Sequence, residues 1–179
     1  MPGLTRLDAA EAPSYARPMA RKRLTHIDAR GRVRMVDVGA KPVTARAAVA
    51  RGRLFMHRDT LALLESGEAP KGDVIATAHV AGVMAAKRTG DLIPLAHPLA
   101  LDGVDMAFLP DHDSCSMLIE ARVRTRARTG VEMEALTAVS VAALTLYDML
   151  KSVDRGMVIG EIALWEKRGG RSGVYRRRP

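Results

Sequence analysis

Hydrophobic and polar residues alternate most regularly between residues 115 and 128. The odd positions from Met117 to Val123 are apolar, whereas the even positions hold Glu120 and then a row of arginines: Arg122, Arg124, Arg126 and Arg128. Because successive side chains of a strand point to opposite faces, this pattern predicts a strand with one apolar and one basic face. The basic face can contact phosphates, but a solvated sheet face or an inter-subunit surface would carry the same residues.

Six further segments carry strand or helix signals. The predicted strands cover residues 43–56, interrupted near Gly52, residues 104–109 in a hairpin with the alternating strand, and residues 157–167. The predicted helices cover residues 60–66, ended by Gly67, residues 73–87, capped by Asp73, and residues 132–152. This β-α-β-β-α-β order is typical of a ferredoxin-like α+β sandwich, an antiparallel sheet with helices packed on one face.

The longest predicted helix carries a partly polar stripe about 120° wide. Its members are Glu134, Thr137, Val141, Thr145, Asp148 and Lys151. Most solvent faces are richer in Lys and Glu, so the stripe predicts a covered surface, with a plain solvent face as the alternative. Glu134 and Asp148 lie about 21 Å apart along the axis, too far to contact one small ligand. Two antiparallel copies of the helix across a twofold axis would bring Glu134 of one copy toward Asp148 and Lys151 of the other.

Composition restricts the class of protein. The 179 residues, 47% of them hydrophobic, suit one domain with a substantial core. The lone Cys115 excludes an internal disulfide, and no apolar run approaches the roughly 20 residues that span a bilayer. We therefore expect a cytoplasmic protein without membrane association, with a flexible arm at residues 1–23, a domain at 24–175 and a basic tail at 176–179.

The formal charge of +8 predicts an anionic partner. Aromatic residues are few, and none is interleaved with basic residues as in proteins that stack single-stranded bases. This favours a small phosphorylated ligand over nucleic acid. The start of the helix after Lys71 offers free amides to such a ligand, although the feature is common in helices without ligands.

Recognised catalytic motifs are missing from the sequence. The histidines have no metal-ligand spacing, and neither a nucleophile elbow nor a glycine-rich phosphate loop occurs. We therefore expect no tightly bound metal. His97 lies between Pro94 and Pro98 on stiffened backbone, which suits either a structural or a catalytic histidine.

Nine short motifs occur in order along residues 24–175. They are LTHID at 24–28, MVDV at 35–38, PKGDV at 70–74, AAKRT at 85–89, DLIPL at 91–95, TGVEMEALT at 129–137, YDM at 147–149, MVIG at 157–160 and GGRSG at 169–173. Together they resemble the cyclic pyranopterin monophosphate synthase family, which is the molybdenum cofactor biosynthesis protein C family. The resemblance spans nearly the whole predicted domain and is specific.

The resemblance implies a lyase of molybdenum cofactor biosynthesis. Its substrate would be (8S)-3',8-cyclo-7,8-dihydroguanosine 5'-triphosphate, converted into cyclic pyranopterin monophosphate with release of diphosphate. It also implies a homohexamer, a trimer of dimers with active sites at the dimer interfaces. A loosely bound magnesium ion and transient contact with the upstream radical-SAM GTP cyclase are left open by the resemblance.

The resemblance also implies roles for individual residues. Asp148, Lys151 and Lys71 match catalytic positions, and the substrate-binding positions are matched by Leu95, Ala96, His97, Glu132, Met133, Glu134 and Lys167. Lysines suit phosphate binding, and a lysine desolvated near another cation would have a lowered pKa that helps it to exchange protons.

Three positions depart from the family pattern. Ala96 replaces the usual cysteine, His79 replaces an arginine, and Arg171 replaces a lysine. The first change removes a thiol, the second removes a cation at neutral pH, and the third keeps the charge. Two other functions fit some of these features: an RNA-binding module, because RNA-recognition domains share this sheet, and an oligomeric scaffold that has lost its activity.

Overall fold

The computed structural model describes residue 32 and residues 34–178, and the chain from Met35 onward forms one unit. Its strands are β1 (Thr44–Phe55), β2 (Gly103–Asp111), β3 (Ser116–Ala127), β4 (Val158–Arg168) and β5 (Tyr175–Arg176). Its helices are α1 (Arg58–Ser66), α2 (Val74–Lys87), α3 (Thr89–Leu92) and α4 (Glu132–Leu150). The predicted arm at 1–23 and the motif at 24–28 lie outside the described residues.

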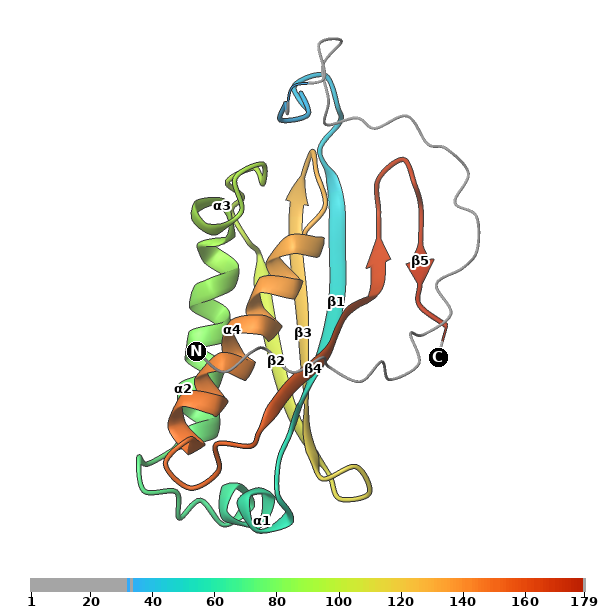
Figure 1. Ribbon diagram of the computed structural model, residues 1–179. Coiled ribbons are helices and arrows are strands. Elements are labelled where there is room, and N and C mark those ends of the chain that lie inside the picture. The colour runs from blue at the N-terminus through green and yellow to red at the C-terminus, as the bar shows by residue number, and fades with distance from the viewer. Residues whose placement is uncertain (1–31, 33, 179) are drawn as a thin grey trace. The chain divides into compact units, whose positions relative to one another are not determined.

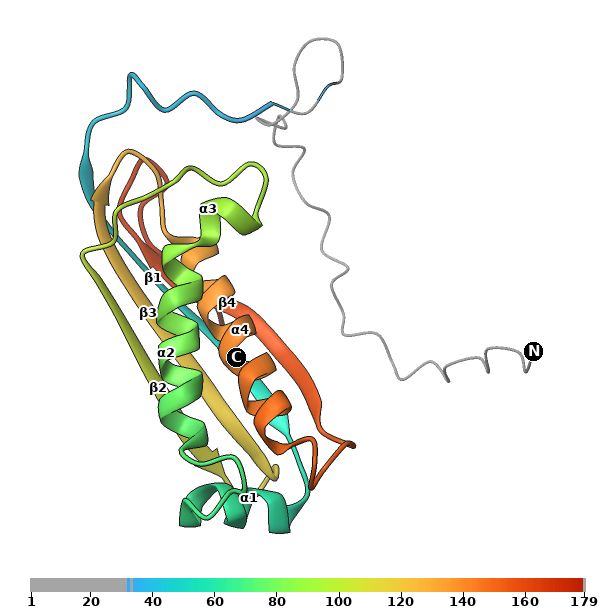
Figure 2. The same cartoon turned by 90° about the vertical axis from the view of Figure 1, so that its left-hand side faces the viewer.

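One antiparallel sheet has the strand order β2-β3-β1-β4-β5, and α2 and α4 cover one of its faces (Figures 1 and 2). This arrangement confirms the predicted ferredoxin-like α+β fold. The short elements α3 and β5 are additions that the sequence analysis does not predict. The opposite face of the sheet is not covered by α2 or α4, and it carries the basic residues of β3.

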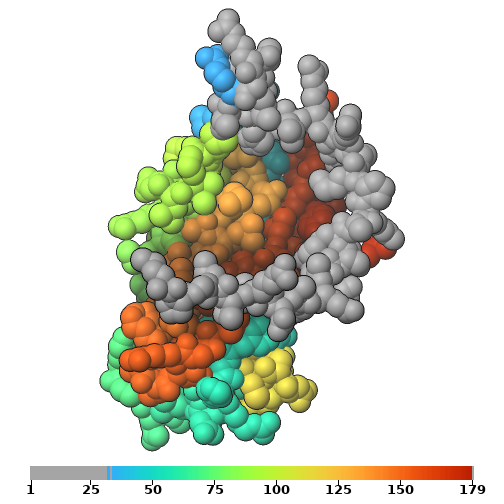
Figure 3. Space-filling model, viewed as in Figure 1, coloured from blue at the N-terminus to red at the C-terminus, as the bar shows by residue number. Residues whose placement is uncertain are grey.

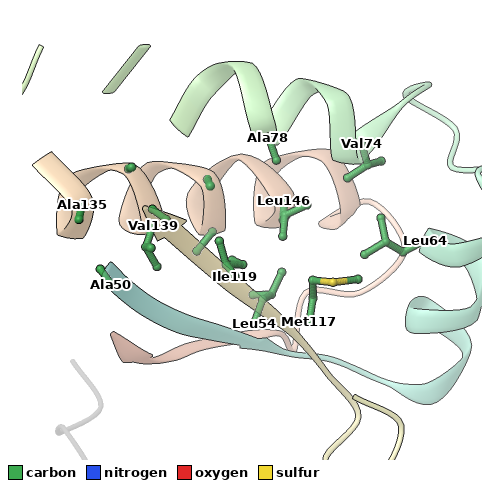
Figure 4. Close-up of a cluster of buried hydrophobic side chains, with 14 of the residues drawn as sticks. Ala50, Leu54, Leu64, Val74, Ala78, Met117, Ile119, Ala135, Val139 and Leu146 are labelled. Atoms are coloured by element: carbon green, nitrogen blue, oxygen red, sulfur yellow. The ribbon is translucent and has the colours of Figure 1, made fainter. Parts of the chain in front are cut away.

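The core lies between α4 and the strands below it. Ala50, Leu54, Ile119, Val139 and Leu146 are fully buried and converge there (Figure 4). The apolar face predicted for β3 is confirmed, because its odd positions belong to this core. Among the described helices, α4 alone is long and apolar enough to cross a membrane, but half of the apolar stretch is buried inside the unit, as in any core helix.

The interruption predicted at Gly52 affects only one side of β1. Pairing of β1 with β3 is continuous, whereas its register with β4 shifts between Arg51 and Arg53. A Cβ atom at Gly52 would lie 2.8 Å from Val139 Cγ1 and 2.9 Å from Ile162 Cγ1. The glycine therefore lets α4 approach the sheet closely at this irregularity.

The predicted helix ends are mostly confirmed. Asp73 caps α2 by accepting a 2.8 Å hydrogen bond from the Ala76 N–H, and Gly67 ends α1 with a left-handed φ of 75°. The last turn of α4 is shorter than predicted, since the helix stops at Leu150.

The start of α1 is capped from a distant part of the chain. His57 supplies no side-chain cap, and buried Asp154, after α4, takes that place. Its Oδ2 accepts hydrogen bonds from the His57 N–H (2.9 Å) and the Thr60 hydroxyl (3.1 Å), and its Oδ1 accepts one from the Gly156 N–H (2.9 Å). Burial raises the pKa of Asp154, but these three hydrogen bonds outweigh that effect and lower its pKa below the usual value.

We predict that Asp154→Ala lowers the free energy of unfolding by about 2 kcal/mol at pH 7, because it leaves buried donors without their charged acceptor. Since the folded-state pKa is lowered, this stabilisation is present above about pH 4 and disappears as the pH falls through the folded-state value. Denaturant titrations between pH 3 and 7 measure it, with exposed Asp113→Ala as the control. Equal stability of both variants at pH 7 would contradict the distant cap.

Candidate functional site

Three charged side chains that were predicted to be catalytic meet at the C-terminal end of α4. Lys151 Nζ lies 2.7 Å from Asp148 Oδ1, and Lys71 Nζ donates a 2.8 Å hydrogen bond to the Asp148 carbonyl and lies 3.4 Å from Oδ2. Lys71 reaches this place because the chain turns at Ala69–Gly72, with Gly72 at a φ of 86°. We call these residues the lysine–aspartate cluster.

The lysine–aspartate cluster is open to solvent, since the three side chains are 40–59% exposed. This end of α4 and the following segment, in orange, lie on the surface in Figure 3, next to α1. The hydrogen bond and charge of Lys151, assisted by Lys71, lower the pKa of Asp148, and Asp148 in turn raises the pKa of Lys151. A lowered pKa is expected only for a lysine desolvated near another cation, whereas Lys151 is exposed and its nearest charge is the carboxylate of Asp148.

A second group of charged residues surrounds a cavity of about 770 Å³ at the other end of α4. Segments 40–46, 128–132 and 167–172 form its wall, and Glu132 is the one acidic residue among the described residues that line it. The basic lining residues are Lys41, Arg46, Arg128, Lys167, Arg168 and Arg171. We call this cavity the basic pocket.

The glycine-rich loop after β4 shapes the basic pocket. Gly169 and Gly170 have φ values of 91° and 74°, and a Cβ at Gly170 would overlap the guanidinium of Arg46. The two glycines therefore make room for Arg46 at the start of β1. Lys167 Nζ donates a hydrogen bond to Ser172 Oγ across the same loop. The Thr44 hydroxyl is buried at the pocket wall and has no hydrogen-bond partner among the described residues.

The predicted loop Leu95, Ala96 and His97 follows α3, and all three residues are half-buried. The views in Figures 1 and 2 place α3 beside the first turn of α4, and the two helices are in contact. Met133 is exposed on that turn, while Glu134 is buried. These residues therefore lie at the same end of α4 as the basic pocket.

The predicted site residues thus form two groups in one chain. Lys71, Asp148 and Lys151 lie at one end of α4, and Glu132, Lys167 and the loop at 95–97 lie at the other. Sixteen residues separate Glu132 from Asp148, which is about 24 Å of helix. The distance argument made from the sequence is therefore supported by the observed helix, which is continuous between them.

The covering predicted for the polar stripe of α4 holds only for its first half. Glu134 and Thr137 are buried within their own chain, while Asp148 and Lys151 are exposed. Burial, followed by the nearby charge of Glu132, raises the pKa of Glu134, although a hydrogen bond to its own N–H opposes the shift.

Several residues of the basic pocket are not predicted from the sequence. Arg46, Arg128 and Arg168 come from the ends of three strands and adjoining turns, and only the sheet register brings them together. No spacing along the chain signals this convergence. Among the described residues, no group of three or more His, Cys, Asp or Glu side chains is arranged to hold a metal ion.

We predict that Glu134→Gln raises the melting temperature at pH 7, because ionising the buried carboxyl opposes folding. A raised folded-state pKa means that stability falls as the pH rises from about 4 toward that pKa, so the gain should vanish at low pH. Thermal unfolding from pH 4 to 8 tests this, with exposed Glu68→Gln as the control. A loss of stability that is largest at neutral pH would contradict it and indicate a cationic partner for Glu134.

Comparison with known proteins matches this unit to one family. The sequence model of the MoaC family matches residues 35–170, which contain both the lysine–aspartate cluster and most of the basic pocket. A relative from Thermomicrobium roseum is 62% identical over 154 residues, covering 86% of this chain and 93% of its own. Relatives from Chloroflexus aurantiacus and Mycobacterium tuberculosis are each 61% identical, covering 88% and 86% of this chain and 97% and 90% of theirs.

The relatives from the first two organisms are named cyclic pyranopterin monophosphate synthase, and the third cyclic pyranopterin monophosphate synthase 1. The family match covers more than half of the chain, and the relatives align over most of their own length. The chain belongs to the MoaC family.

Proposed function

We propose that this chain is a cyclic pyranopterin monophosphate synthase, a lyase of molybdenum cofactor biosynthesis. It converts the cyclised dihydroguanosine triphosphate into cyclic pyranopterin monophosphate and releases diphosphate. The names of its relatives support this assignment, and so does the chemistry of the site. Family membership favours the enzyme over the RNA-binding alternative.

The observation that carries the assignment is the charge of the basic pocket. Among the described residues, six cationic side chains and one carboxylate line it, so this part of the chain presents a large positive excess to a ligand. Guanidinium groups bind phosphate oxygens in pairs, and lysines add mobile point charges. A cavity of about 770 Å³ is in the range that takes a nucleotide-sized molecule.

The reactive groups belong to the lysine–aspartate cluster. With its pKa lowered, Asp148 is ionised at neutral pH and can accept a proton, whereas Lys151 is protonated and can donate one. Ring opening and reclosure of the substrate require several such transfers. Lys71, on the other side of the carboxylate, adds a positive charge for the phosphate groups. His97, on the loop after α3, adds an imidazole from the other end of α4, and position 96 contributes no proton because it is alanine.

A complete site requires two copies of the chain. One rigid helix separates the two groups by about 24 Å, and a small triphosphate cannot contact both within one subunit. A twofold axis that sets two α4 helices antiparallel would place the lysine–aspartate cluster of one copy at the basic pocket of the other. Exposed apolar side chains on the helical layer, Val80, Met84 and Leu144, are suited to such an interface. A hexamer, as a trimer of these dimers, is our proposal for the full assembly.

We propose that neither magnesium nor the upstream enzyme has a permanent site on this chain, and that both act on the substrate. We expect a magnesium ion to be held by the phosphates of the substrate. Transfer of the substrate from the radical-SAM GTP cyclase requires no more than transient contact. The cytoplasm is the compartment that we propose for the reaction.

We predict that Asp148→Asn retains the fold and assembly but lowers turnover about 100-fold or more, because the amide cannot accept the proton. The assay supplies the enzymatically prepared cyclised triphosphate, and follows diphosphate release together with pterin fluorescence after oxidation. Exposed Asp59→Asn is the control and should retain full activity. Near-normal turnover by Asp148→Asn would remove this carboxylate from the mechanism.

A second prediction tests the shared site. Asp148→Asn and Lys167→Ala damage opposite ends of α4, so each variant alone should be nearly inactive. When the two variants are co-expressed with different tags, random pairing makes about half of the dimers mixed. Each mixed dimer has one intact site of two, so about a quarter of wild-type activity should return in the whole sample. Each variant co-expressed with a differently tagged copy of itself is the control. Failure of the mixed sample to exceed these controls would contradict a site shared between copies.

A further inference from the structure

The chain leaves α4 through a tight turn at residues 151–156, which we call the post-α4 turn. The N–H groups of Val153 and Asp154 donate hydrogen bonds to the carbonyl of Leu150, at 2.9 and 3.0 Å. Lys151, a member of the lysine–aspartate cluster, is the first residue of this turn. The position of its amine therefore depends on how the turn is held.

Two side chains hold the post-α4 turn. The Tyr147 hydroxyl donates a 3.2 Å hydrogen bond to the carbonyl of Arg155, and the Tyr147 ring packs against the core. The Asp154 carboxylate accepts a hydrogen bond from the Gly156 N–H within the turn and two more from donors at the start of α1. The turn is therefore fixed to α4 on one side and to α1 on the other.

The Asp154 carboxylate also connects the two segments that carry the lysines of the cluster. Helix α1 leads into the turn at Ala69–Gly72, from which Lys71 reaches Oδ2 of Asp148. Lys151 reaches Oδ1 of the same carboxylate from the post-α4 turn. Hydrogen bonds of one buried side chain therefore join the segments that bring both lysines to Asp148.

The ion pair between Lys151 and Asp148 does not fix its own geometry. The two side chains are 52% and 59% exposed, and they are three residues apart on a helix. Such exposed pairs contribute little stability, because the charges are solvated and two flexible side chains must be ordered. The backbone that carries Lys151 has to be held by other groups if the amine is to stay beside the carboxylate.

A cap for α1 alone does not require this arrangement. A Ser, Thr, Asn or Asp at position 57 would supply an N-cap locally. Asp154 is instead 4% exposed and comes from a segment 97 residues away. Burial of a carboxylate is unfavourable unless hydrogen bonds offset the lost hydration. A distant, buried carboxylate therefore favours a role in fixing the post-α4 turn relative to α1.

We infer that Tyr147 and Asp154 are positioning residues for the reaction, because they hold the post-α4 turn where Lys151 stays paired with Asp148. This inference rests on the proposed function, in which Lys151 donates a proton and Asp148 accepts one. Neither positioning residue is required to touch the substrate. A displacement of the amine by about 1 Å is enough to slow proton transfer strongly.

The test compares Tyr147→Phe with Tyr175→Phe. The first substitution removes a hydroxyl from the post-α4 turn and keeps the ring in the core, whereas the second removes one from an exposed tyrosine of β5. With the cyclised triphosphate as substrate, we expect Tyr147→Phe to lower kcat about tenfold and to change KM less than about twofold. Tyr175→Phe should match the wild type. Asp154→Asn is a second variant with the same expected direction, because an amide cannot accept hydrogen bonds at both of its ends.

The pH profile of kcat separates positioning from a loss of stability. Asp148 raises the pKa of Lys151, so a displaced Lys151 has a lower pKa and loses its proton at a lower pH. The alkaline limb of kcat should therefore move to lower pH in Tyr147→Phe. A variant that is merely less stable would lose activity by the same factor along this limb.

Labelling of lysines gives a readout that does not depend on turnover. A limiting amount of acetic anhydride at about pH 9 modifies deprotonated amines, and mass spectrometry of peptides measures Lys151 relative to exposed Lys87. We expect relative labelling of Lys151 to rise about threefold in Tyr147→Phe and in Asp154→Asn, which corresponds to a fall of about half a pKa unit.

Wild-type kcat in both variants would overturn the inference, and so would a lowered kcat with an unchanged pH profile and unchanged labelling. Should Asp154→Asn fail to fold, Tyr147→Phe alone decides. Faster labelling of Lys151 in the variants of a protein whose wild type shows no turnover would keep the hold on the post-α4 turn and remove the synthase assignment.

Discussion

The burial of α4 against the sheet is the constraint on which the site depends. Its inward residues from Ala135 to Leu150 are fully buried, so the helix cannot shift or bend to bring its ends together. Each end nevertheless carries charged groups that suit the same substrate. The fold therefore fixes the distance between the lysine–aspartate cluster and the basic pocket, and one substrate molecule cannot contact both in a single chain. The dimer proposed above follows from that distance.

The two ends of α4 differ in their electrostatics. At the C-terminal end of α4, Asp148 lies between two lysines, and each charge stabilises the ionised form of its neighbour. At the N-terminal end, cations outnumber carboxylates among the described residues that line the basic pocket. The first arrangement suits proton transfer between paired groups, while the second suits the binding of a polyanion. Glycines at 52 and 169 permit the close packing of these elements.

Periodicity and caps were sufficient to predict most of the fold. The alternation in β3, the Asp73 cap and the Gly67 stop are local signals, and each is confirmed. Helix α3 and strand β5 were missed because four and two residues are too few to show a period. The distal cap by Asp154 was also missed, since nothing in the sequence near α1 points to a residue almost a hundred positions away.

The candidate site was predictable only in part. The resemblance located both groups of residues, and the rise of the helix predicted their separation. The arginines that complete the basic pocket come from strand ends, and their convergence depends on register and on the positive φ values of the glycine-rich loop. The ion pair between Asp148 and Lys151 follows from their spacing of three residues on one helix, and it accounts for the raised pKa of Lys151.

The most direct test of the account is zero-length carbodiimide crosslinking of assemblies made from mixed unlabelled and ¹⁵N-labelled chains. Glu132 and Lys151 are 19 residues apart on one helix, about 28 Å, so no such crosslink can form within a chain. The account predicts a peptide joining Glu132 of one isotopic form to Lys151 of the other. An active protein that yields no crosslink between the two ends of α4, or that is monomeric during turnover, would contradict it.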